Sequence, residues 1–235
     1  MILEVSGINT YYGTSHILFD LSLHMKRGEL VCLLGRNVSG KTTTLRSIMG
    51  LTTPKTGKVL FHGEDLRGKP SYVVARKGIG YVPDNRLIFP DLTVRENLDI
   101  AGKGSEHYAG EPWTVEKVYE TFPHLQKLEK HLGGHLSGGE QQMLTIGRTL
   151  MGNPELILLD EPVEGLAPLI VKDFAEKLIK LKEMGVTILF SEQNIRFSLA
   201  IAERAYVINK GRIEYEGTIA DLSGNEEIKK KYLMI

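Results

Sequence analysis

Residues 35–42 follow the pattern G-x-x-x-x-G-K-[ST], which is typical of a loop that binds nucleotide phosphates. In such a loop, backbone N–H groups surround the phosphates at the start of a helix, where the helix dipole favours anions. We expect Lys41 to reach the β- and γ-phosphates and the Thr42 hydroxyl to bind Mg²⁺. The expected phosphate-binding residues are Gly35, Arg36, Asn37, Val38, Ser39, Gly40, Lys41, Thr42 and Thr43.

Two adjacent carboxylates follow an apolar run further along the chain. Residues 156–159 are apolar, and Asp160 and Glu161 come directly after them. This pattern indicates a buried strand that ends in two acids, at the sheet edge where ligands of open α/β sheets bind. We expect Asp160 to hold Mg²⁺ through water and Glu161 to polarise the attacking water as a general base. Such a pair alone is more often a solvated strand end, so the prediction depends on the phosphate loop.

A second anion-binding pattern stands between these two motifs. Ser137, Gly138 and Gly139 precede a helix-compatible sequence, which places a hydroxyl and bare backbone N–H groups at a helix start. A single chain does not need two sites for one γ-phosphate. An isolated Ser-Gly-Gly is most often a plain helix cap, whereas the full string of residues 136–142 is far more specific.

Short apolar runs predict the strands that position these residues. Residues 31–34 break at Gly35 and lead into a helical sequence from 41 to 49, which gives the order strand, glycine loop, helix. Residues 156–159 and 186–190 are similar runs, each after helix-compatible sequence. We therefore expect an α/β fold with a covered, parallel sheet.

Smaller elements flank this core in one domain of residues 1–235. Antiparallel ribbons are expected at residues 3–5, 57–61, and 206–208 with 212–214. Residues 1–83 and 143–235 form the core and the β flank, and residues 84–142 form a helical insertion. The residues expected on one helical face of that insertion are Val115, Val118, Tyr119 and Phe122. Residues 102–112 are expected to be a loop because they hold several glycines and a proline.

Composition excludes several classes of protein. The 235 residues suffice for one well-buried domain, and lysine plus arginine equal aspartate plus glutamate at 29 each, so no global charge attracts nucleic acid. Cys32 is the one cysteine, which excludes a disulfide framework and fits a reducing cytoplasm. No apolar stretch approaches the roughly 20 residues that span a bilayer, and no secretory pattern opens the chain. We therefore expect any membrane role to come through a partner.

The phosphate loop, the string 136–142 and the acid pair, in this order, resemble the three nucleotide-handling motifs of ATP-binding cassette (ABC) ATPases. The resemblance implies a P-loop NTPase (RecA-like) α/β core, an antiparallel β subdomain and an α-helical insertion. It also implies that residues 137–139 of one subunit, the signature, close over ATP held by another subunit in a head-to-tail dimer. Tyr12, just before Gly13, matches the family's aromatic loop and would stack on adenine, with Tyr11 as the alternative.

Some positions depart from the family pattern. Val38 replaces a glycine, and a β-branched residue is strained at positive φ, so either the loop tolerates valine or nucleotide binding is weakened. Asp84 stands where most members have a glutamine that touches Mg²⁺, and an acid there could also reach metal or water. Gln193 replaces a switch histidine, and its amide can donate to the γ-phosphate but carries no titrating charge near neutral pH. Val163 and Glu164 also depart from the pattern.

Four features together resemble one subgroup of the ABC ATPases: Asp84, the segment 165–168, the string 192–194 and the ending 231–233. This subgroup is the second ATPase subunit of branched-chain amino acid importers, the LivF-like type, and related urea and amide importers share most of these features. The expected catalytic residues are Glu161, Gln193 and Lys41, and the expected metal ligands are Thr42, Asp160 and Asp84.

By this resemblance, the chain would hydrolyse Mg-ATP to drive a permease from the inner face of the cell membrane. The implied partners are a second ABC ATPase subunit, identical or related, two integral-membrane permease subunits and a periplasmic solute-binding protein, without nucleic acid. Residues 84–97 are the expected permease contact. Two alternatives stay open: a soluble ABC ATPase not tied to transport, and a nucleotide-binding module with little or no hydrolysis.

Overall fold

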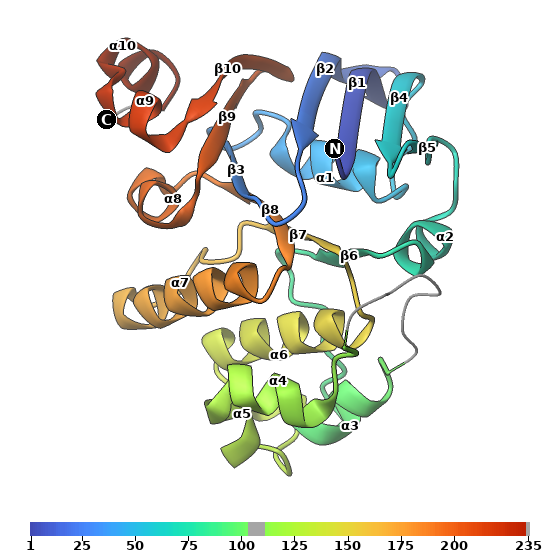
Figure 1. The fold of residues 1–235 in the computed structure, drawn as a ribbon, viewed down its shortest axis with the longest axis vertical. Helices are drawn as coiled ribbons and strands as arrows, with labels where there is room; N and C mark the ends of the chain where they lie inside the picture. The colour runs from blue at the N-terminus through green and yellow to red at the C-terminus, as the bar shows by residue number, and fades with distance from the viewer. Residues whose placement is uncertain (103–110, 234–235) are drawn as a thin grey trace.

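Two β-sheets carry the fold over residues 1–102 and 111–233, which the computed structural model describes. The larger sheet comprises β3 (Leu30–Leu34), β6 (Ile79–Val82), β7 (Leu156–Asp160), β8 (Thr187–Glu192), β9 (Arg204–Asn209) and β10 (Arg212–Thr218), in the order β10-β9-β3-β8-β7-β6. The smaller sheet comprises β1 (Leu3–Tyr12), β2 (Ser15–Met25), β4 (Thr56–Phe61) and β5 (Glu64–Asp65), in the order β2-β1-β4-β5. In Figure 1 the smaller sheet lies at the top, the larger sheet runs from β10 at the top to β6 near the middle, and a group of helices lies below.

The central strands of the larger sheet are parallel and apolar. Every residue of β3, β7 and β8 is buried, as expected for continuous apolar runs in a sheet covered on both faces. The register pairs Leu34 with Glu192 and Asp160 with Ser191. The carboxyl ends of these strands therefore lie side by side, which confirms the predicted strand edge and brings the phosphate loop close to the acid pair.

The edge of this sheet differs in one respect from the expected flanking ribbon. β9 and β10 do pair antiparallel, but β9 also pairs in parallel with β3 and so belongs to the larger sheet. The physical reason is that residues 205–208 are apolar and fully covered, which suits an internal strand.

The smaller sheet is antiparallel and contains a strand that the sequence did not reveal. β2 pairs with the whole length of β1 across a turn at Gly13, which has a φ of 58°. Bulges interrupt this pairing, so the alternation of apolar and polar residues in β2 is irregular. Because of this irregularity, a strict alternation of apolar and polar residues does not identify β2 in the sequence.

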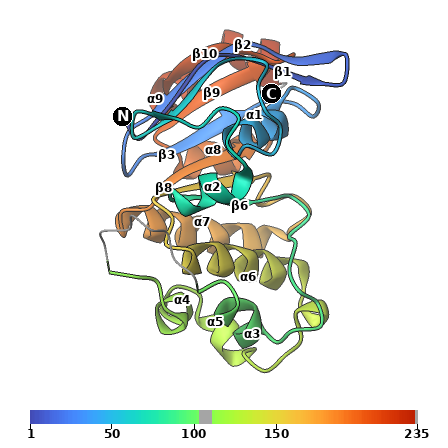
Figure 2. The same cartoon turned by 90° about the vertical axis from the view of Figure 1, so that its right-hand side faces the viewer.

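The helices below the sheets are α3 (Val94–Asp99), α4 (Val115–Thr121), α5 (Pro123–Lys127) and α6 (Gly138–Met151), with a 3₁₀ turn at Gly133–His135. The four residues expected on one face, from Val115 to Phe122, are all buried. The expected boundary at residue 142 falls inside α6, because this helix continues without a break to Met151. The turned view in Figure 2 shows these helices at the end of the molecule opposite the smaller sheet. Residues 103–110 of the expected loop lie outside the described residues.

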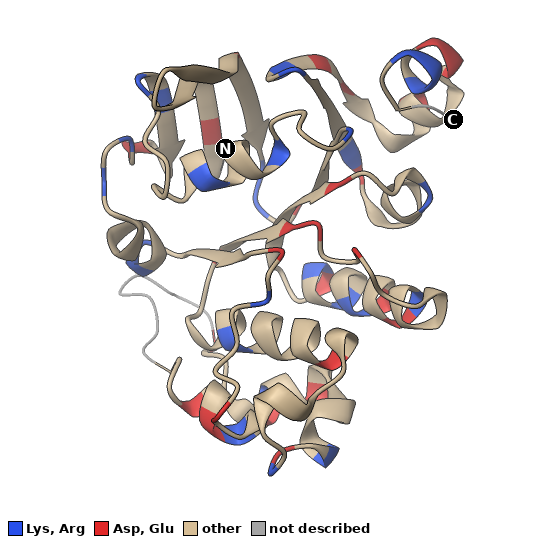
Figure 3. Ribbon diagram, turned by 180° about the vertical axis from the view of Figure 1, so that it is seen from behind, with Lys and Arg blue, Asp and Glu red and all other residues tan. Residues whose placement is uncertain are grey.

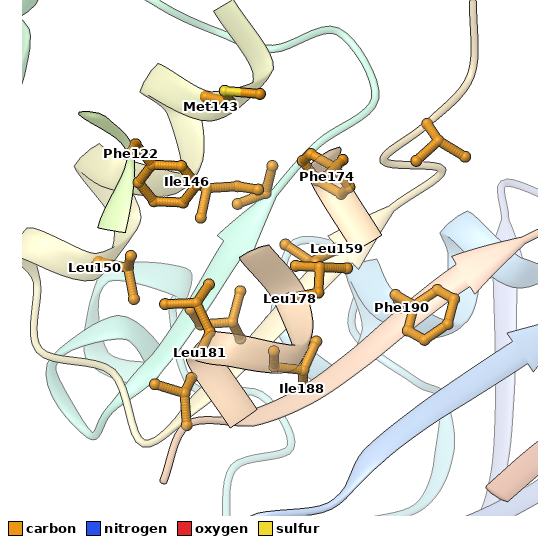
Figure 4. Close-up of a cluster of buried hydrophobic side chains, with 14 of the residues drawn as sticks. Phe122, Met143, Ile146, Leu150, Leu159, Phe174, Leu178, Leu181, Ile188 and Phe190 are labelled. Carbon is orange, nitrogen blue, oxygen red and sulfur yellow. The ribbon is translucent and has the colours of Figure 1, made fainter. Parts of the chain in front are cut away.

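The remaining helices are α1 (Lys41–Ile48), α2 (Ser71–Arg76), α7 (Pro168–Glu183), α8 (Ile195–Ile201), α9 (Ile219–Gly224) and α10 (Glu226–Ile228), followed by a π-helical turn at Lys229–Leu233. Side chains of α6 and α7 pack with those of β7 and β8 in one buried cluster (Figure 4). Phe174 and Leu178 of α7 lie in this cluster with Ile146 of α6. Since burying each such side chain contributes about 1.5–3 kcal/mol, the cluster fixes α6 against the strand that carries the acid pair.

Charged residues are spread over the molecule. In Figure 3 the basic and acidic segments alternate over both the sheets and the helices, as the equal counts of the two kinds imply. Within residues 1–102 and 111–233, none of the helices combines the length and the apolar character needed to cross a bilayer.

Candidate nucleotide-binding and hydrolysis site

The loop of residues 35–40 leaves β3 and ends at the first turn of α1, which holds Thr42 and Thr43. Gly35 must be glycine, because a Cβ there would lie 2.5 Å from the Ile208 carbonyl oxygen. Gly40 has a φ of 113°, which only glycine adopts readily. Both end glycines of the loop are thus required, Gly35 by a close backbone approach and Gly40 by its positive φ.

Val38 has a left-handed backbone conformation. Its φ is 64°, and its side chain is fully exposed. A left-handed conformation costs an L-residue about 1–2 kcal/mol, and β-branched residues such as valine adopt it least readily. No packing of the side chain offsets this strain. The structure therefore answers the question raised by the sequence: the loop does require positive φ at this position, and valine adopts it under strain.

Lys41 lies inside the curve of the loop. Its ammonium donates to the carbonyl oxygens of Gly35 at 2.9 Å and Arg36 at 3.0 Å, and its Nζ lies 3.1 Å from Oε1 of Glu161. The side chain is only 3% exposed. This positive charge therefore lies at the centre of the site, between the loop and the acid pair.

Asp160 is fully buried at the end of β7 and accepts three hydrogen bonds from hydroxyl groups. Oδ1 accepts from Thr42 at 3.1 Å and from Ser191 at 2.6 Å, and Oδ2 accepts from Tyr81 at 3.2 Å. Burial raises the pKa of Asp160; the hydroxyl bonds oppose this shift, while the charge of Asp84 adds to it. One carboxylate and the adjacent Thr42 hydroxyl are hard oxygen donors that suit Mg²⁺, which keeps several waters and phosphate oxygens as its other ligands.

Glu161 follows Asp160 with a left-handed backbone, at a φ of 45°. Its N–H donates to the hydroxyl and to the carbonyl oxygen of Ser191, both at 3.1 Å, which holds this conformation. The charge of Glu161 raises the pKa of Glu164, so the two carboxylates lie close together. The Glu161 carboxylate itself points to Lys41.

Gln193 and Asp84 lie at the margins of this centre. Gln193 is exposed and lines a pocket of about 290 Å³ with Gly35, Arg36 and Asn37, so it faces the phosphate loop. Asp84 is exposed and acts on Asp160 through its charge. Both residues therefore lie on the same side of the sheet as the loop and the acids.

The two candidate aromatic residues differ in what covers them. Tyr11 stacks on His16 at a ring-centroid distance of 4.0 Å, and the Lys55 ammonium lies 5.3 Å from its ring centre. Tyr12 is 45% exposed, and its hydroxyl accepts a hydrogen bond from Thr52 at 3.5 Å. The exposure of the ring supports Tyr12 over Tyr11 as the base-stacking residue.

The Ser-Gly-Gly string forms the start of α6 but lies apart from the phosphate loop. Ser137 caps the helix by a reciprocal arrangement with Glu140. With Gly139 it lines a separate pocket of about 440 Å³ against α7. A Cβ on Gly138 would lie 2.5 Å from the Arg86 guanidinium, which is the end of a flexible side chain. Within one chain the structure unites the loop with the acid pair and leaves the signature at another surface.

Sequence reasoning missed several polar residues that support the site. Tyr81 and Ser191 hold Asp160, and Glu192 accepts hydrogen bonds beside them. One signal was available for the last two, because they directly follow the predicted strand 186–190 and so lie at the same sheet edge as Asp160. Arg86 also joins two parts of the chain, since its guanidinium donates to the Glu164 carbonyl oxygen at 3.3 Å.

A profile of the ABC transporter family matches residues 18–164, which hold the phosphate loop, the signature and the acid pair. The chain belongs to the ABC transporter family. It is an ATP-binding cassette with the ATP hydrolase activity of that family.

Curated relatives match the cassette over nearly its whole length. The high-affinity branched-chain amino acid transport ATP-binding protein BraG of Pseudomonas aeruginosa is 42% identical over 99% of both chains. The probable branched-chain amino acid transport ATP-binding protein LivF of Archaeoglobus fulgidus is 34% identical over 97% of both. The lipopolysaccharide export ATP-binding protein LptB of Escherichia coli is 35% identical over 98% of this chain and 96% of its own.

Solved structures of ABC cassettes have the same fold. A nucleotide-free cassette superimposes with a TM-score of 0.83 at 28% identity, covering 97% of this chain and 96% of its own. A dimeric bacterial ABC transporter cassette gives a TM-score of 0.77 at 27% identity, over 92% of this chain and 98% of its own. The predicted fold class, a P-loop NTPase core with β and helical additions, is confirmed.

Proposed function

We propose that this cassette is the ATPase subunit of an importer that takes up branched-chain or other hydrophobic amino acids. The similarity to BraG, at 42% identity over almost the entire chain, supports this class of cargo. Related urea and amide importers are the nearest alternative within the same subgroup. The LptB relatives, at 35% identity, make a lipid-export system the alternative outside it.

The observation that supports hydrolysis most strongly is the convergence of Lys41, Asp160 and Glu161 at the carboxyl ends of β3 and β7. Mg²⁺ held by Asp160 and Thr42, with Asp84 close by, would neutralise negative charge on the phosphates. Lys41 would exchange its two loop carbonyls for oxygens of the β- and γ-phosphates. Phosphoryl transfer of this kind depends largely on positioning and charge stabilisation, which these side chains supply.

Glu161 would act as the general base. With Lys41 engaged by phosphate, the carboxylate is released to accept a proton from water as that water attacks the γ-phosphorus, and ADP departs. Gln193, on the loop side of the site, would donate its amide to the γ-phosphate. Tyr12 would stack on the adenine.

We further propose a head-to-tail dimer as the working form. The separation of the Ser137 pocket from the phosphate loop supports this arrangement, because the signature then serves ATP held by a second cassette. The hydroxyl and the N–H groups at the start of α6 would bind the γ-phosphate across the interface. The second cassette would be identical or related.

The permease would contact the cassette beside Asp84. A pocket of about 520 Å³ lies there, with Leu87 and Arg148 among its lining residues. Leu87 is 60% exposed and Phe89 is 44% exposed, so apolar side chains are available at the surface of the segment 84–97. Through two permease subunits and a periplasmic binding protein, the cassette would work at the inner face of the membrane.

Uptake by the reconstituted system tests this proposal. The cassette and its permease subunits are placed in vesicles loaded with Mg-ATP, with the cassette facing inward and the binding protein added outside. Uptake of labelled leucine is then compared with that of labelled urea. We expect leucine uptake that disappears in the Glu161→Gln variant. Urea uptake alone would assign the amide class, and hydrolysis stimulated by lipopolysaccharide without any uptake would overturn the importer assignment.

One observation favours the second candidate function, a binding module with weak hydrolysis. The strained φ of 64° at Val38 lies within the loop that must wrap the phosphates. Such strain would lower nucleotide affinity if the loop relaxed away from the binding conformation. The retained geometry of Lys41 and Glu161 supports the active cassette instead.

A further inference from the structure

Glu192 is a buried carboxylate to which the mechanism above gives no role. It is the last residue of β8 and is 2% exposed. It stands between the loop that follows the acid pair and Gln193. A buried carboxylate is costly unless hydrogen bonds compensate it, so its partners indicate what it does.

Both carboxylate oxygens of Glu192 accept from backbone N–H groups. Oε1 accepts from Val163 at 3.3 Å, and Oε2 accepts from Gln193 and Asn194, each at 3.1 Å. The backbone carbonyl oxygen of Glu192 accepts from the N–H of Gly35 at 3.1 Å. One residue therefore links the start of the phosphate loop, the segment after Glu161 and the segment that begins at Gln193.

We propose that Glu192 is a positioning residue for hydrolysis, which holds the segment 163–166 and Gln193 at a fixed separation through its two carboxylate oxygens. The proposal rests on the proposed roles of Glu161 and Gln193. Glu192 touches neither substrate nor the reacting atoms. It acts through the backbone of Val163, close to the general base, and of Gln193, which faces the phosphate loop.

Above pH 7, where the Glu192 carboxyl is ionised in the folded chain, both of its oxygens serve as acceptors in these contacts. An ionised carboxylate offers acceptors on both oxygens, whereas a glutamine amide offers one oxygen acceptor and one N–H₂ donor. In a Glu192→Gln variant, either Val163 or the Gln193–Asn194 pair would face a donor in place of an acceptor. The side chain keeps its size, so this variant breaks one side of the link with little change in packing.

A second carboxylate that bonds a backbone N–H, but with an exposed side chain, serves as a control at the opposite end of the sheet. Glu203 also accepts from a backbone N–H, that of Leu30 at 3.2 Å, and forms an ion pair with Lys182 at 2.9 Å. Glu203→Gln therefore removes a carboxylate that holds a strand, without altering the strand ends that carry the site. It reports the effect of a structural carboxylate on folding and on the rate.

The experiment measures ATP affinity and the maximal hydrolysis rate of the full chain at pH 8, where the Glu192 carboxyl is ionised. For Glu192→Gln we expect an unchanged dissociation constant for ATP, within about twofold, and a kcat lower by about tenfold or more; Glu203→Gln should match the wild type in both. A purely structural carboxylate would not separate the two quantities. A kcat within twofold of the wild type, or an equal loss of affinity and kcat, would overturn the proposal.

Hydrogen exchange gives a second test that does not depend on activity. The amides of Val163 and Gln193 should exchange slowly in the wild type and about tenfold faster in Glu192→Gln, while the amide of Leu158 inside β7 stays unchanged. Fast exchange of the first two amides in the wild type rules the link out, even if the variant does not fold. If the Val163 and Gln193 amides exchange slowly in the wild type but the wild type does not hydrolyse ATP, the result would contradict the enzyme assignment and still support the hydrogen bonds made by Glu192.

Discussion

At the scale of the residue, the site depends on which charges are buried together. Lys41 is almost fully buried, and its partners are two loop carbonyls and Glu161. Asp160 has three hydroxyl donors, which hold its carboxylate in one orientation. The Lys41 cation therefore lies beside the proposed general base, Glu161. In the proposed mechanism, phosphate would draw Lys41 away and so make the Glu161 carboxylate available only with substrate in place.

Relief of the strain at Val38 gives a direct test of the phosphate loop. Because the side chain is fully exposed at a φ of 64°, Val38→Gly loses no packing and removes about 1–2 kcal/mol of strain. We expect Mg-ATP to bind about fivefold tighter or better, as measured by calorimetric titration. Val38→Ala keeps a Cβ without the branch and should fall between the two. Equal affinities in all three chains would show that the strain does not act on binding.

The pKa of Glu192 predicts how stability changes with pH. Burial raises this pKa to about 7, against the backbone N–H bonds that lower it, whereas in the unfolded chain it has its ordinary value near 4.5. Between these values the folded chain holds a proton that the unfolded chain has lost, so stability falls as the pH rises from about 4.5 to 7. Across this pH range the titration of Glu192 lowers the free energy of unfolding by about 3 kcal/mol, and Glu192→Gln removes this pH dependence.

Urea unfolding at pH 5 and pH 8 measures this effect. The variant should gain stability relative to the wild type at the higher pH. Asp160, whose pKa burial also raises, contributes equally in both chains and cancels. Parallel pH dependences of the two chains would show that Glu192 does not titrate in this range.

At the scale of the element, the sequence predicted the features that short periodic runs define. The parallel strands, the glycine loop and the helical face from Val115 to Phe122 follow from local apolar patterns, and the structure confirms them. The strand β2 has a bulged alternation, and the parallel pairing of β9 with β3 depends on partners far away in the chain. Local patterns cannot specify either feature.

The same limit applies to the site. The charged residues of the motifs could be found because their spacing is local. The roles of Tyr81 and Arg86 could not be found in this way. Tyr81 contacts Asp160 only because β6 pairs with β7, and Arg86 contacts Glu164 only because two segments distant in the sequence lie together in the fold. Supporting residues of this kind can be identified only from the three-dimensional structure, once the pairing of the strands is known.

The start of α6 allows the capping role of Ser137 to be separated from its proposed role toward phosphate. Aspartate caps a helix as well as serine does. The free energy of unfolding of Ser137→Asp should therefore lie within about 0.5 kcal/mol of the wild-type value, whereas that of Ser137→Ala should be lower by about 1 kcal/mol. An aspartate would repel the γ-phosphate of a partner, so we expect hydrolysis to fall at least about tenfold in Ser137→Asp. Unfolding curves and hydrolysis rates of both variants measure this. Full activity of Ser137→Asp would leave Ser137 as a cap alone.

At the scale of the whole molecule, the phosphate loop and the signature of one chain lie on different surfaces, as the proposed head-to-tail dimer needs. The phosphate loop and the acid pair lie at the sheet edge, and the signature lies against α7. α6 is packed against β7 and β8 through the buried cluster of Figure 4, so the signature has a fixed position relative to the acids. A second cassette in reversed orientation would complete both sites at once.

The dependence of hydrolysis on protein concentration tests this arrangement. If two chains form each site, the rate per chain should rise with concentration and then level off, whereas a site complete within one chain gives a constant rate. In Glu161→Gln, ATP should bind without being cleaved, so ATP should shift this variant from monomer to dimer in gel filtration, and ADP should not. Adding Ser137→Asp to that variant should prevent the shift, because it alters the signature and leaves the phosphate loop intact. A constant rate per chain would overturn the dimer. No rate above that of Glu161→Gln at any concentration, together with a monomeric Glu161→Gln, would mean that the working partner is a different cassette, because the signature of this chain would then meet the phosphate loop of a related subunit.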